Sequence, residues 1–334
     1  MIKIAIDMQG GDNSYETTIP ALKEFLETYP DSFVFACGDE DVLKQHFANM
    51  EERVEIVDAK DIIPMEAGVL DVLRLKNSPI IKGIGLIRDK KADAIVSSGS
   101  TGGFLSAATL TLKNIPGIKR AALVSPFPTF IKGKQTVVLD IGANNENSEI
   151  ELAQFALMGR IYSNKIVGVP NPKVYLLSNG SEDMKGSPLV KNTAKLLKES
   201  SFPNFMGNVE ANHALDGEAD VVVCDGFTGN IFLKGLEGVL KYMGNSIKTT
   251  FKKNIASKVA YLMVRKSINE MNETLKYNHL GGAMLLGING VCVKAHGNSK
   301  PDAFFHSIRI AYQLAKEDVI TLLREGCRDE LGRD

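Results

Sequence analysis

Short runs rich in β-branched residues alternate with longer helix-like segments along the 334 residues of the chain. Strands that alternate with helices predict βαβ units, in which helices pack on the faces of a mostly parallel sheet. We therefore expect an α/β fold with a doubly wound sheet that is covered on both faces. The expected strands are 2–6, 33–37, 94–97, 136–139, 173–177, 220–224 and 291–293.

Length and composition favour one large domain or two closely associated ones. With 44% hydrophobic and 24% charged residues, the chain can bury a substantial core without disulfides or a metal. A net charge of −1 gives no whole-chain attraction to nucleic acid, so an electrostatic partner must bind a local patch. Residues 115–134 are rich in Pro, Gly and Lys and are expected to leave the main sheet.

The N-terminus leads from a strand-like run directly to Asp7, without the basic and apolar segments of a signal peptide. No run approaches the roughly 18 apolar residues of a membrane span. We therefore expect a cytoplasmic protein. The cysteines are scattered without a close pair, which argues against a zinc site or a disulfide framework. The three in strand-like runs are expected to be small buried hydrophobes rather than reactive thiols. The four cysteines are Cys37, Cys224, Cys292 and Cys327.

Several apolar runs deliver the chain into a cluster of Asp, Asn, Ser, Thr and Gly residues. In a doubly wound sheet the carboxyl ends of the strands line one crevice, so these clusters can converge on one ligand. Ordinary turns use the same residue types, but five or six such clusters favour a shared site. The candidates for binding substrate or phosphate are Asp7, Gly11, Asp12, Ser98, Gly99, Ser100, Thr101, Gly102, Asp140, Asn179, Asp225 and Thr228.

The segment 97–103 lies between an expected strand and an expected helix. Free backbone N–H groups at a helix N-terminus suit phosphate, and glycine allows close approach of an anion. The segment lacks the Gly-Lys-Ser/Thr ending of a nucleotide P-loop and the spacing of a dinucleotide fingerprint, so we expect no nucleotide cofactor. A hydroxyl here that simply caps the helix is an equally good interpretation.

Three residues are candidates for the chemistry itself. His296 follows an apolar strand and is suited to acid–base work or to donating a hydrogen bond to phosphate, although a histidine that only holds a turn fits equally well. Asn144 and Asn230 offer amide donors in two further strand-end clusters.

The segment from Lys248 to Lys266 is basic and contains no acidic residue. Apolar residues recur at helical spacing on two rotated stripes, which predicts two short amphipathic helices with a break near residues 263–264. An acidic carrier protein or an anionic membrane surface would suit this segment, and a solvated face or a dimer surface is the alternative. The predicted binding residues are Lys252, Lys253, Lys258, Arg265 and Lys266.

Taken together, several motifs resemble the phosphate acyltransferases of the PlsX type. Each motif alone is weak, but they occur in the family's order over nearly the whole chain. The motifs are 4–7 with 10–12, 92–97 with 101–102, 139–144, 154–159, 219–230 and 281–287 with 296–297.

The resemblance implies a three-layer αβα fold like that of isocitrate and isopropylmalate dehydrogenases. It implies a single domain over residues 1–334, with a basic amphipathic helical excursion at about 246–277, and a homodimer. The implied reaction moves a fatty acyl group from acyl carrier protein to inorganic phosphate and gives acyl phosphate for phospholipid synthesis, without a cofactor or metal. A glycerol-3-phosphate acyltransferase downstream and loose contact with the inner face of the cell membrane are also implied.

The chain departs from the family pattern at four places: Gln9, Ser100, 145–147 and 211–213. Residues 145–147 lack the cysteine that is common in the family, which argues for direct attack by phosphate rather than a cysteine nucleophile. The expected consequence of the departures is a changed rate or substrate preference.

Two other functions compete with acyl transfer. A nicotinamide-dependent hydroxy-acid dehydrogenase of related fold would need an acidic metal site and arginines for the substrate carboxylates, and arginines are sparse near the strand-end clusters. A non-catalytic scaffold that binds a carrier protein or a membrane would have no use for those clusters.

Overall fold

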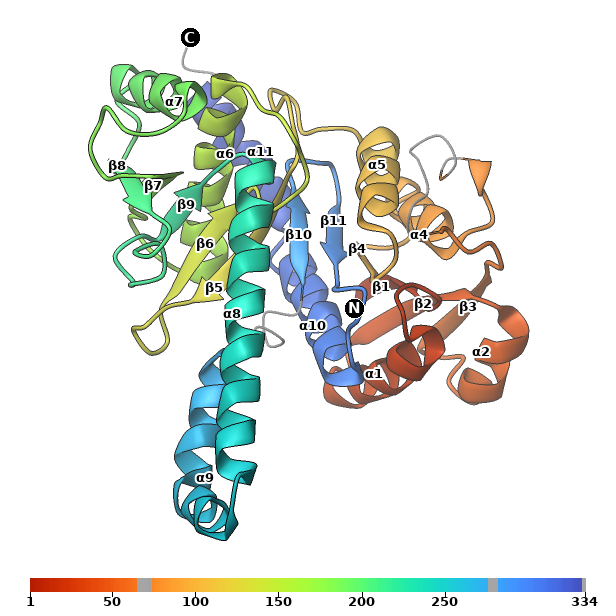
Figure 1. Cartoon of the computed structure of the whole chain (residues 1–334). Coiled ribbons are helices and arrows are strands. Elements are labelled where there is room, and N and C mark those ends of the chain that lie inside the picture. The colour runs from red at the N-terminus through yellow and green to blue at the C-terminus, as the bar shows by residue number, and fades with distance from the viewer. Residues whose placement is uncertain (65–71, 73, 276–281, 332–334) are drawn as a thin grey trace.

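The computed structural model describes residues 1–64, 72, 74–275 and 282–331, and these build one sheet with helices on both faces (Figure 1). The strand order is β3-β2-β1-β4-β11-β10-β5-β6-β9-β7-β8. The strands are β1 (Ile2–Asp7), β2 (Ser32–Gly38), β3 (Val54–Asp58), β4 (Ala94–Ser97), β5 (Ala122–Pro128), β6 (Gln135–Leu139), β7 (Val174–Ser178), β8 (Phe205–Glu210), β9 (Val221–Val223), β10 (Ala283–Leu286) and β11 (Val291–Lys294). The helices are α1 (Ser14–Thr28), α2 (Glu40–Phe47), α4 (Pro79–Arg88), α5 (Thr101–Leu112), α6 (Glu149–Tyr162), η1 (Ser163–Val167), α7 (Pro188–Glu199), α8 (Gly226–Lys252), α9 (Ile255–Leu275), α10 (Pro301–Lys316) and α11 (Val319–Leu331).

The two ends of the sheet run in opposite directions. β3, β2, β1, β4 and β11 are mutually parallel, and so are β6, β9, β7 and β8. β10 and β5 join these two groups through three antiparallel pairings. The strands of the two parallel groups therefore end at opposite edges of the sheet. The expectation that the carboxyl ends of all the strands line one crevice is wrong. The twist of about 20–25° per strand pair turns β6 by roughly 80–100° relative to β4.

The segment 115–134 does not leave the sheet as the sequence suggested, because its middle forms the central strand β5. Pro126 and Pro128 lie in this strand although proline cannot donate a hydrogen bond to a neighbour. β10 pairs only with residues 122–124 of β5, so the prolines lie beyond that pairing. Only the turn after β5 protrudes, and its residue Phe130 is 81% exposed.

The core consists of two layers, one on each face of the sheet. Alternating residues of β1 illustrate the division: Ile4 and Ile6 pack in the layer with α1, α6, α10 and α11. Ala5 packs in the layer with α4, α5 and the first turns of α8. Because successive side chains of a strand point to opposite faces, both layers are specified by the near-continuous apolar runs predicted as strands.

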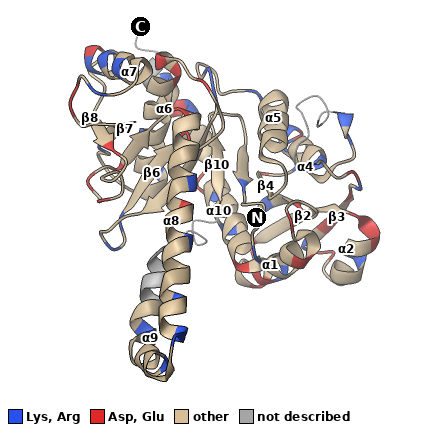
Figure 2. Ribbon diagram, in the orientation of Figure 1, with Lys and Arg blue, Asp and Glu red and all other residues tan. Residues whose placement is uncertain are grey.

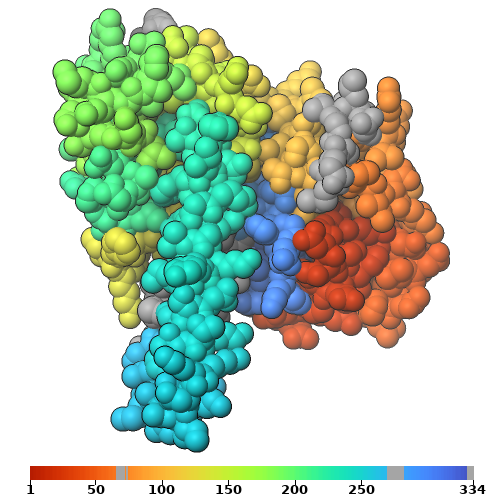
Figure 3. All heavy atoms as spheres, viewed as in Figure 1, coloured from red at the N-terminus to blue at the C-terminus, as the bar shows by residue number. Residues whose placement is uncertain are grey.

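Helices α8 and α9 form a hairpin that projects from the body of the protein (Figures 1 and 3). The predicted break near residues 263–264 is wrong, because α9 continues through this point. The break lies at 253–254, where Asn254 Oδ1 accepts a 2.8 Å hydrogen bond from Ser257 N and so caps α9. Residues 276–277 of the predicted excursion lie outside the described residues. Within the described part of the chain, none of the helices is long and apolar enough to cross a membrane.

Candidate active site

Three neighbouring strands, β1, β4 and β11, end in polar residues that lie close together. Ser97 ends β4, and its hydroxyl donates a 2.6 Å hydrogen bond to Oδ2 of Asp7 at the end of β1. Asp7 Oδ1 accepts hydrogen bonds from the backbone N–H groups of Gln9 (3.1 Å) and Gly10 (2.9 Å). Lys294 ends β11 in register with Ser97. We call Asp7, Ser97 and Lys294 the Asp7 cluster.

Two glycines allow the loop after β1 to pack against the loops after β4 and β11. A Cβ on Gly10 would lie 2.6 Å from the backbone nitrogen of Gly99. Gly11 has a φ of +79°, and a Cβ there would lie 2.6 Å from the carbonyl oxygen of Gly297. The same oxygen accepts a 2.9 Å hydrogen bond from Asp12 N. The structure thus brings Gly11, Asp12 and Gly99 together, as the sequence predicted.

Lys294 was not among the residues singled out from the sequence, although its side chain is buried in the site. The residue is only 7% exposed, and its ammonium group donates a hydrogen bond to the carbonyl oxygen of Ala295. Burial lowers the pKa of Lys294 to about 8, partly offset by the nearby charges of Asp7 and Asp12. Burial likewise raises the pKa of the Asp7 carboxyl. The available signal was a lysine at the end of an otherwise apolar strand, directly before the Ala-His-Gly motif.

His296 lies at the rim of the Asp7 cluster with its side chain 56% exposed. The backbone N–H of Asn298 donates a 3.2 Å hydrogen bond to His296 Nδ1, so the neutral ring carries its hydrogen on Nε2. Nε2 lies 3.9 Å from Glu237 Oε1, which is too far for a hydrogen bond. Burial lowers the pKa of His296, which favours the neutral ring. His296 is therefore arranged to donate from Nε2 rather than to act as a base.

The N-terminus of α5 follows directly on the Asp7 cluster. Ser98 and Ser100 are buried, and Ser100 Oγ accepts a 3.3 Å hydrogen bond from Gly103 N, which caps the helix. Thr101 and Gly102 are exposed in the first turn, where backbone N–H groups have no partner within the helix. Both interpretations of this segment are thus compatible with the geometry, since Ser100 caps the helix while Thr101 and Gly102 remain accessible.

Asp140, which follows β6, is fully buried and accepts five hydrogen bonds. Oδ1 accepts from the backbone N–H groups of Leu123 (3.0 Å), Gly142 (3.0 Å) and Ala143 (2.8 Å). Oδ2 accepts from the backbone N–H (3.0 Å) and the side-chain amide (2.8 Å) of Asn144. Burial raises the pKa of the Asp140 carboxyl, although these hydrogen bonds oppose the shift. We call Asp140 and Asn144 the Asp140 cluster.

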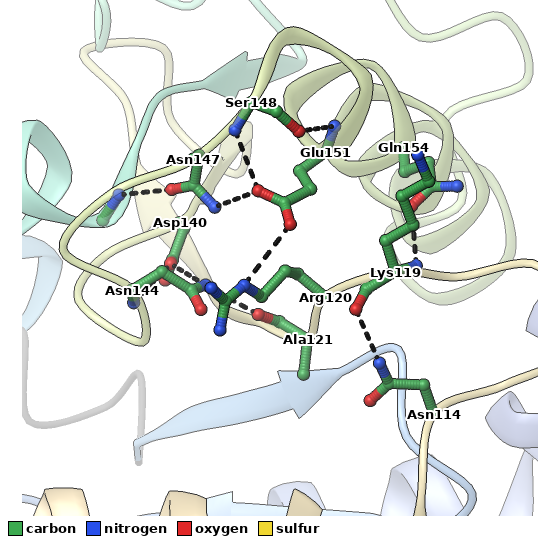
Figure 4. Close-up of polar contacts among 11 residues, drawn as sticks. Asn114, Lys119, Arg120, Ala121, Asp140, Asn144, Asn147, Ser148, Glu151 and Gln154 are labelled. Carbon is green, nitrogen blue, oxygen red and sulfur yellow. Dashed lines mark hydrogen bonds and ion pairs between the residues drawn. The ribbon is translucent and has the colours of Figure 1, made fainter.

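Asn144 uses both hydrogens of its side-chain amide within the protein (Figure 4). Nδ2 donates to Asp140 Oδ2 and, at 2.8 Å, to the carbonyl oxygen of Ala121. In this arrangement Asn144 has no amide hydrogen left for a substrate. Its contacts are those of a residue that holds the loop in place.

Asn147, at one of the departures from the family pattern, joins this loop to two helices (Figure 4). Its Oδ1 accepts a 3.4 Å hydrogen bond from Gly226 N at the start of α8, and its Nδ2 donates at 3.4 Å to Glu151. Glu151 also accepts from Ser148 N at 2.9 Å, which completes a capping box at the start of α6.

Helix α8 begins directly on the Asp140 cluster. A Cβ on Gly226 or Gly229 would lie 2.1 and 1.9 Å, respectively, from backbone oxygens of this cluster, so both positions require glycine. Asp225 caps the helix, because its carboxylate accepts hydrogen bonds from the Thr228 backbone N–H (2.9 Å) and hydroxyl (2.7 Å). Asn230, one turn further along α8, is exposed. It lies close to the loop after β6, because a Cβ added to Gly142 would be 3.4 Å from Cγ of Asn230.

The same helix connects the two clusters. Glu237 on α8 faces His296 of the Asp7 side, and Asn230 faces the Asp140 side. Glu237 lies seven positions after Asn230 on the helix, which corresponds to a rise of about 10 Å. Helix α8 therefore lies beside both groups of strand ends, and the convergence of both groups on one ligand stays a prediction.

Asn179 is the predicted site residue that the structure does not connect to these clusters. It follows β7, which is separated from β6 by β9. Its Oδ1 accepts a 2.9 Å hydrogen bond from Gly186 N within its own loop. In the described part of the chain it makes no hydrogen bond to either cluster.

The sequence comparisons agree with each other over nearly the whole chain. Residues 2–322 match the profile of a family described as a fatty acid synthesis protein. Phosphate acyltransferases from Staphylococcus aureus (strain MRSA252) and Halothermothrix orenii are each 39% identical, over 97% of this chain and 98% of their own length. That of Bacillus subtilis (strain 168) is 36% identical over 98% of this chain and 99% of its own. The chain belongs to the phosphate acyltransferase family.

Membership of the phosphate acyltransferases confirms the resemblance stated from the motifs, and the protein is an acyltransferase of phospholipid and fatty acid synthesis. The dehydrogenase and scaffold alternatives lose their support. Use of an acyl substrate and phosphate follows from the family.

The solved structures that share this fold belong to enzymes with different names. A phosphotransacetylase from Streptococcus pyogenes superposes with a TM-score of 0.62 at 16% identity, over 95% of this chain and 94% of its own. A 4-hydroxythreonine-4-phosphate dehydrogenase from Klebsiella pneumoniae gives 0.56 at 12% identity, over 94% and 99%. At this identity they show the fold alone, and they confirm the expected three-layer αβα arrangement for this phosphate acyltransferase.

All four cysteines are buried and free, which confirms the prediction made for the three in strand-like runs and extends it to Cys327. Burial raises the pKa of each thiol, in the case of Cys327 to about 11. A thiolate nucleophile is thus disfavoured at every cysteine. Within the described ranges, no group of three or more His, Cys, Asp and Glu residues is arranged to hold a metal ion.

Proposed function

We propose that the protein transfers a fatty acyl group from acyl carrier protein to inorganic phosphate by direct attack of phosphate. A phosphate oxygen forms a bond to the thioester carbonyl carbon, and the carbon–sulfur bond then breaks. The proton carried by hydrogen phosphate ends on the carrier thiol, so atoms and charge balance. The observation that carries the proposal is the contrast between four buried cysteines and the accessible polar donors on α5, α8 and after β11.

The geometry suggests how the donors divide the work. Phosphate would bind at the accessible first turn of α5, which includes Thr101 and Gly102, where helix N–H groups favour an anion. Asn230 lies on α8, and His296 Nε2 lies 3.9 Å from Glu237 about two turns further along the same helix; these two groups would donate to the oxyanion and to phosphate. Asn144 would act indirectly, through the loop that seats α8.

Trapping of the product tests this proposal. The protein is incubated with acyl carrier protein thioester and phosphate, and hydroxylamine converts acyl phosphate into a hydroxamate. We expect hydroxamate that depends on phosphate and survives chelation of metal ions. A stable acyl-enzyme formed without phosphate would contradict direct attack, and activity that chelation abolishes and magnesium restores would contradict metal-free chemistry.

We further propose that the α8–α9 hairpin binds the acidic carrier protein or an anionic membrane surface. Its basic residues between Lys248 and Lys266 are exposed, and Figure 2 shows Lys and Arg positions in blue on the hairpin. Exposed apolar residues accompany them: Ile255 (81%), Leu262 (66%) and Met263 (83%). Cations beside exposed apolar side chains are typical of a helix that lies on an anionic surface.

Charge reversal tests the hairpin. Changing Lys252, Lys253, Lys258 and Lys266 to Glu should weaken carrier or vesicle binding, and less so at high salt because exposed charges are screened over about 8 Å at physiological ionic strength. Turnover of a small soluble thioester should be unchanged. Flotation with anionic and neutral vesicles, beside carrier titration, decides the matter. Unaltered association in both assays would contradict a binding role.

We also propose a homodimer. Large apolar residues along α8 are exposed in the single chain, including Phe227 (60%), Ile231 (58%) and Tyr242 (75%). A second copy would cover this surface. Light scattering should give twice the chain mass of 36.3 kDa, and Tyr242→Glu should lower it. A wild-type mass of one chain would contradict the dimer.

A further inference from the structure

We infer that Lys294 is a phosphate-binding residue of this enzyme and supplies the buried positive charge of the anion site. The inference rests on the proposed function and extends it to a residue outside the motifs that identify the family. It starts from the position of the side chain on the sheet.

The three residues of the Asp7 cluster project from the same face of the sheet. Successive side chains alternate between faces, and the residues two positions earlier, Ala5, Ile95 and Cys292, all belong to the core layer of α4, α5 and α8. Lys294 therefore points to the side on which α5 and α8 cover the sheet. Its Cα is in register with that of Ser97, one strand spacing of about 4.8 Å away. Three residues after Ser97, the chain enters the cap of α5.

A buried ammonium group without a direct counter-ion needs an explanation, because removing a charge from water is costly unless it is compensated. Lys294 Nζ donates to the Ala295 carbonyl oxygen. In the described part of the chain it forms no ion pair with a carboxylate. An ammonium group has three hydrogens, so two remain for a ligand. An anion that binds here would supply the missing charge.

The charges around Lys294 come from several elements. Asp7 on β1 and Asp12 in the following loop favour its protonated form, whereas Lys234 on α8 disfavours it. His296 and Glu237 face each other at the rim. The Asp7 carboxylate is already engaged by Ser97 and two backbone N–H groups. A carboxylate can only accept hydrogen bonds, so Lys294 is the charged group of the cluster that has hydrogens left to donate to an anion.

The test compares Lys294→Met with the matched control Lys3→Met. Lys3 lies near the start of β1, at the end of that strand away from Asp7, and its side chain is exposed. Binding of inorganic phosphate is measured by calorimetry without acyl donor, and KM for phosphate and for the thioester by hydroxamate trapping. We expect Lys294→Met to weaken phosphate binding and raise KM for phosphate roughly 10- to 100-fold, with KM for the thioester within about twofold. Lys3→Met should match the wild type. Unchanged phosphate affinity in a folded Lys294→Met protein would overturn the inference.

A measurement on the wild type keeps the inference testable if Lys294→Met does not fold. Binding that requires the ammonium form is lost above a pKa of about 8, so the affinity for the phosphate dianion, corrected for the second ionisation of phosphate near neutral pH, should fall about tenfold between pH 7 and pH 9. The same series with His296→Asn separates the imidazole from the ammonium. Constant affinity across this range contradicts a role for Lys294. Absence of acyl phosphate, with phosphate binding that depends on Lys294, would contradict the proposed reaction but not this site.

Discussion

Asp7 ends a strand in one half of the sheet and Asp140 directly follows a strand in the other half, yet the surroundings of these two carboxylates differ. Both are buried and in both burial raises the pKa of the carboxyl. Asp140 accepts five hydrogen bonds, all from fixed donors. Asp7 accepts three, one of them from a hydroxyl that can rotate, and a buried ammonium lies nearby. The difference indicates that the Asp140 cluster fixes the architecture, whereas the Asp7 cluster keeps groups available for a ligand.

The largest expected effect is a difference in the free energy of unfolding between the variants Asp140→Asn and Asp7→Asn. In Asp140→Asn the new amide must face N–H donors whichever way it is oriented, because both oxygens accept from such groups. We expect the free energy of unfolding to fall by about 2–4 kcal/mol. In Asp7→Asn the Ser97 hydroxyl can rotate and accept instead, so the change should stay within about 1 kcal/mol. Urea unfolding of both variants measures this, and equal losses would remove the distinction.

An effect of intermediate size is expected when Asn230 and Asn144 are each replaced by Ala, because one change should lower turnover and the other stability. Asn230→Ala should lower turnover about 100-fold with little change in stability, since its amide is exposed beside the site. Asn144→Ala should lower stability by about 1–3 kcal/mol, because Asp140 and Ala121 lose a donor. Turnover and unfolding are measured on the same preparations. Thr101→Val should resemble Asn230→Ala, and full activity in both would place the oxyanion and phosphate elsewhere.

The smallest effect concerns the cysteine beneath each cluster. Cys224 Sγ lies 3.4 Å from the Asp140 carbonyl oxygen, and Cys292 is two residues before Lys294 in β11. If neither thiol takes part in the reaction, Cys224→Ala and Cys292→Ala should keep turnover within about twofold. Any stability loss should be that of a small buried side chain, about 1 kcal/mol. A loss of turnover near that of Asn230→Ala, in a folded protein, would reopen covalent catalysis.

The sequence predicted where the polar clusters occur but not which of their groups are available. Asp7, Asp140 and Asp225 were identified because each follows an apolar run. The partners that Asp140 and Asn144 find earlier in the chain could not be identified. Leu123 N donates to Asp140 and Ala121 O accepts from Asn144, and both lie about twenty residues earlier, in or next to a strand that the prolines of segment 115–134 concealed. Lys294 was missed because the expected strand, 291–293, stopped one residue short of it, whereas β11 includes it. The opposite directions of the two halves also depended on β5 and β10, which the sequence did not reveal.

The order of strands in the sheet has a consequence for how the chain is made. β10 and β11, near the end of the chain, lie between β4 and β5 and connect the two halves. Until these residues leave the ribosome, both halves carry an open edge at the future centre of the sheet. Open edges of apolar strands invite pairing with other chains, and contacts between distant segments form slowly. Nascent chains of this protein are therefore most exposed to aggregation just before synthesis ends, and a chaperone that shields β4 and β5 would act at that moment.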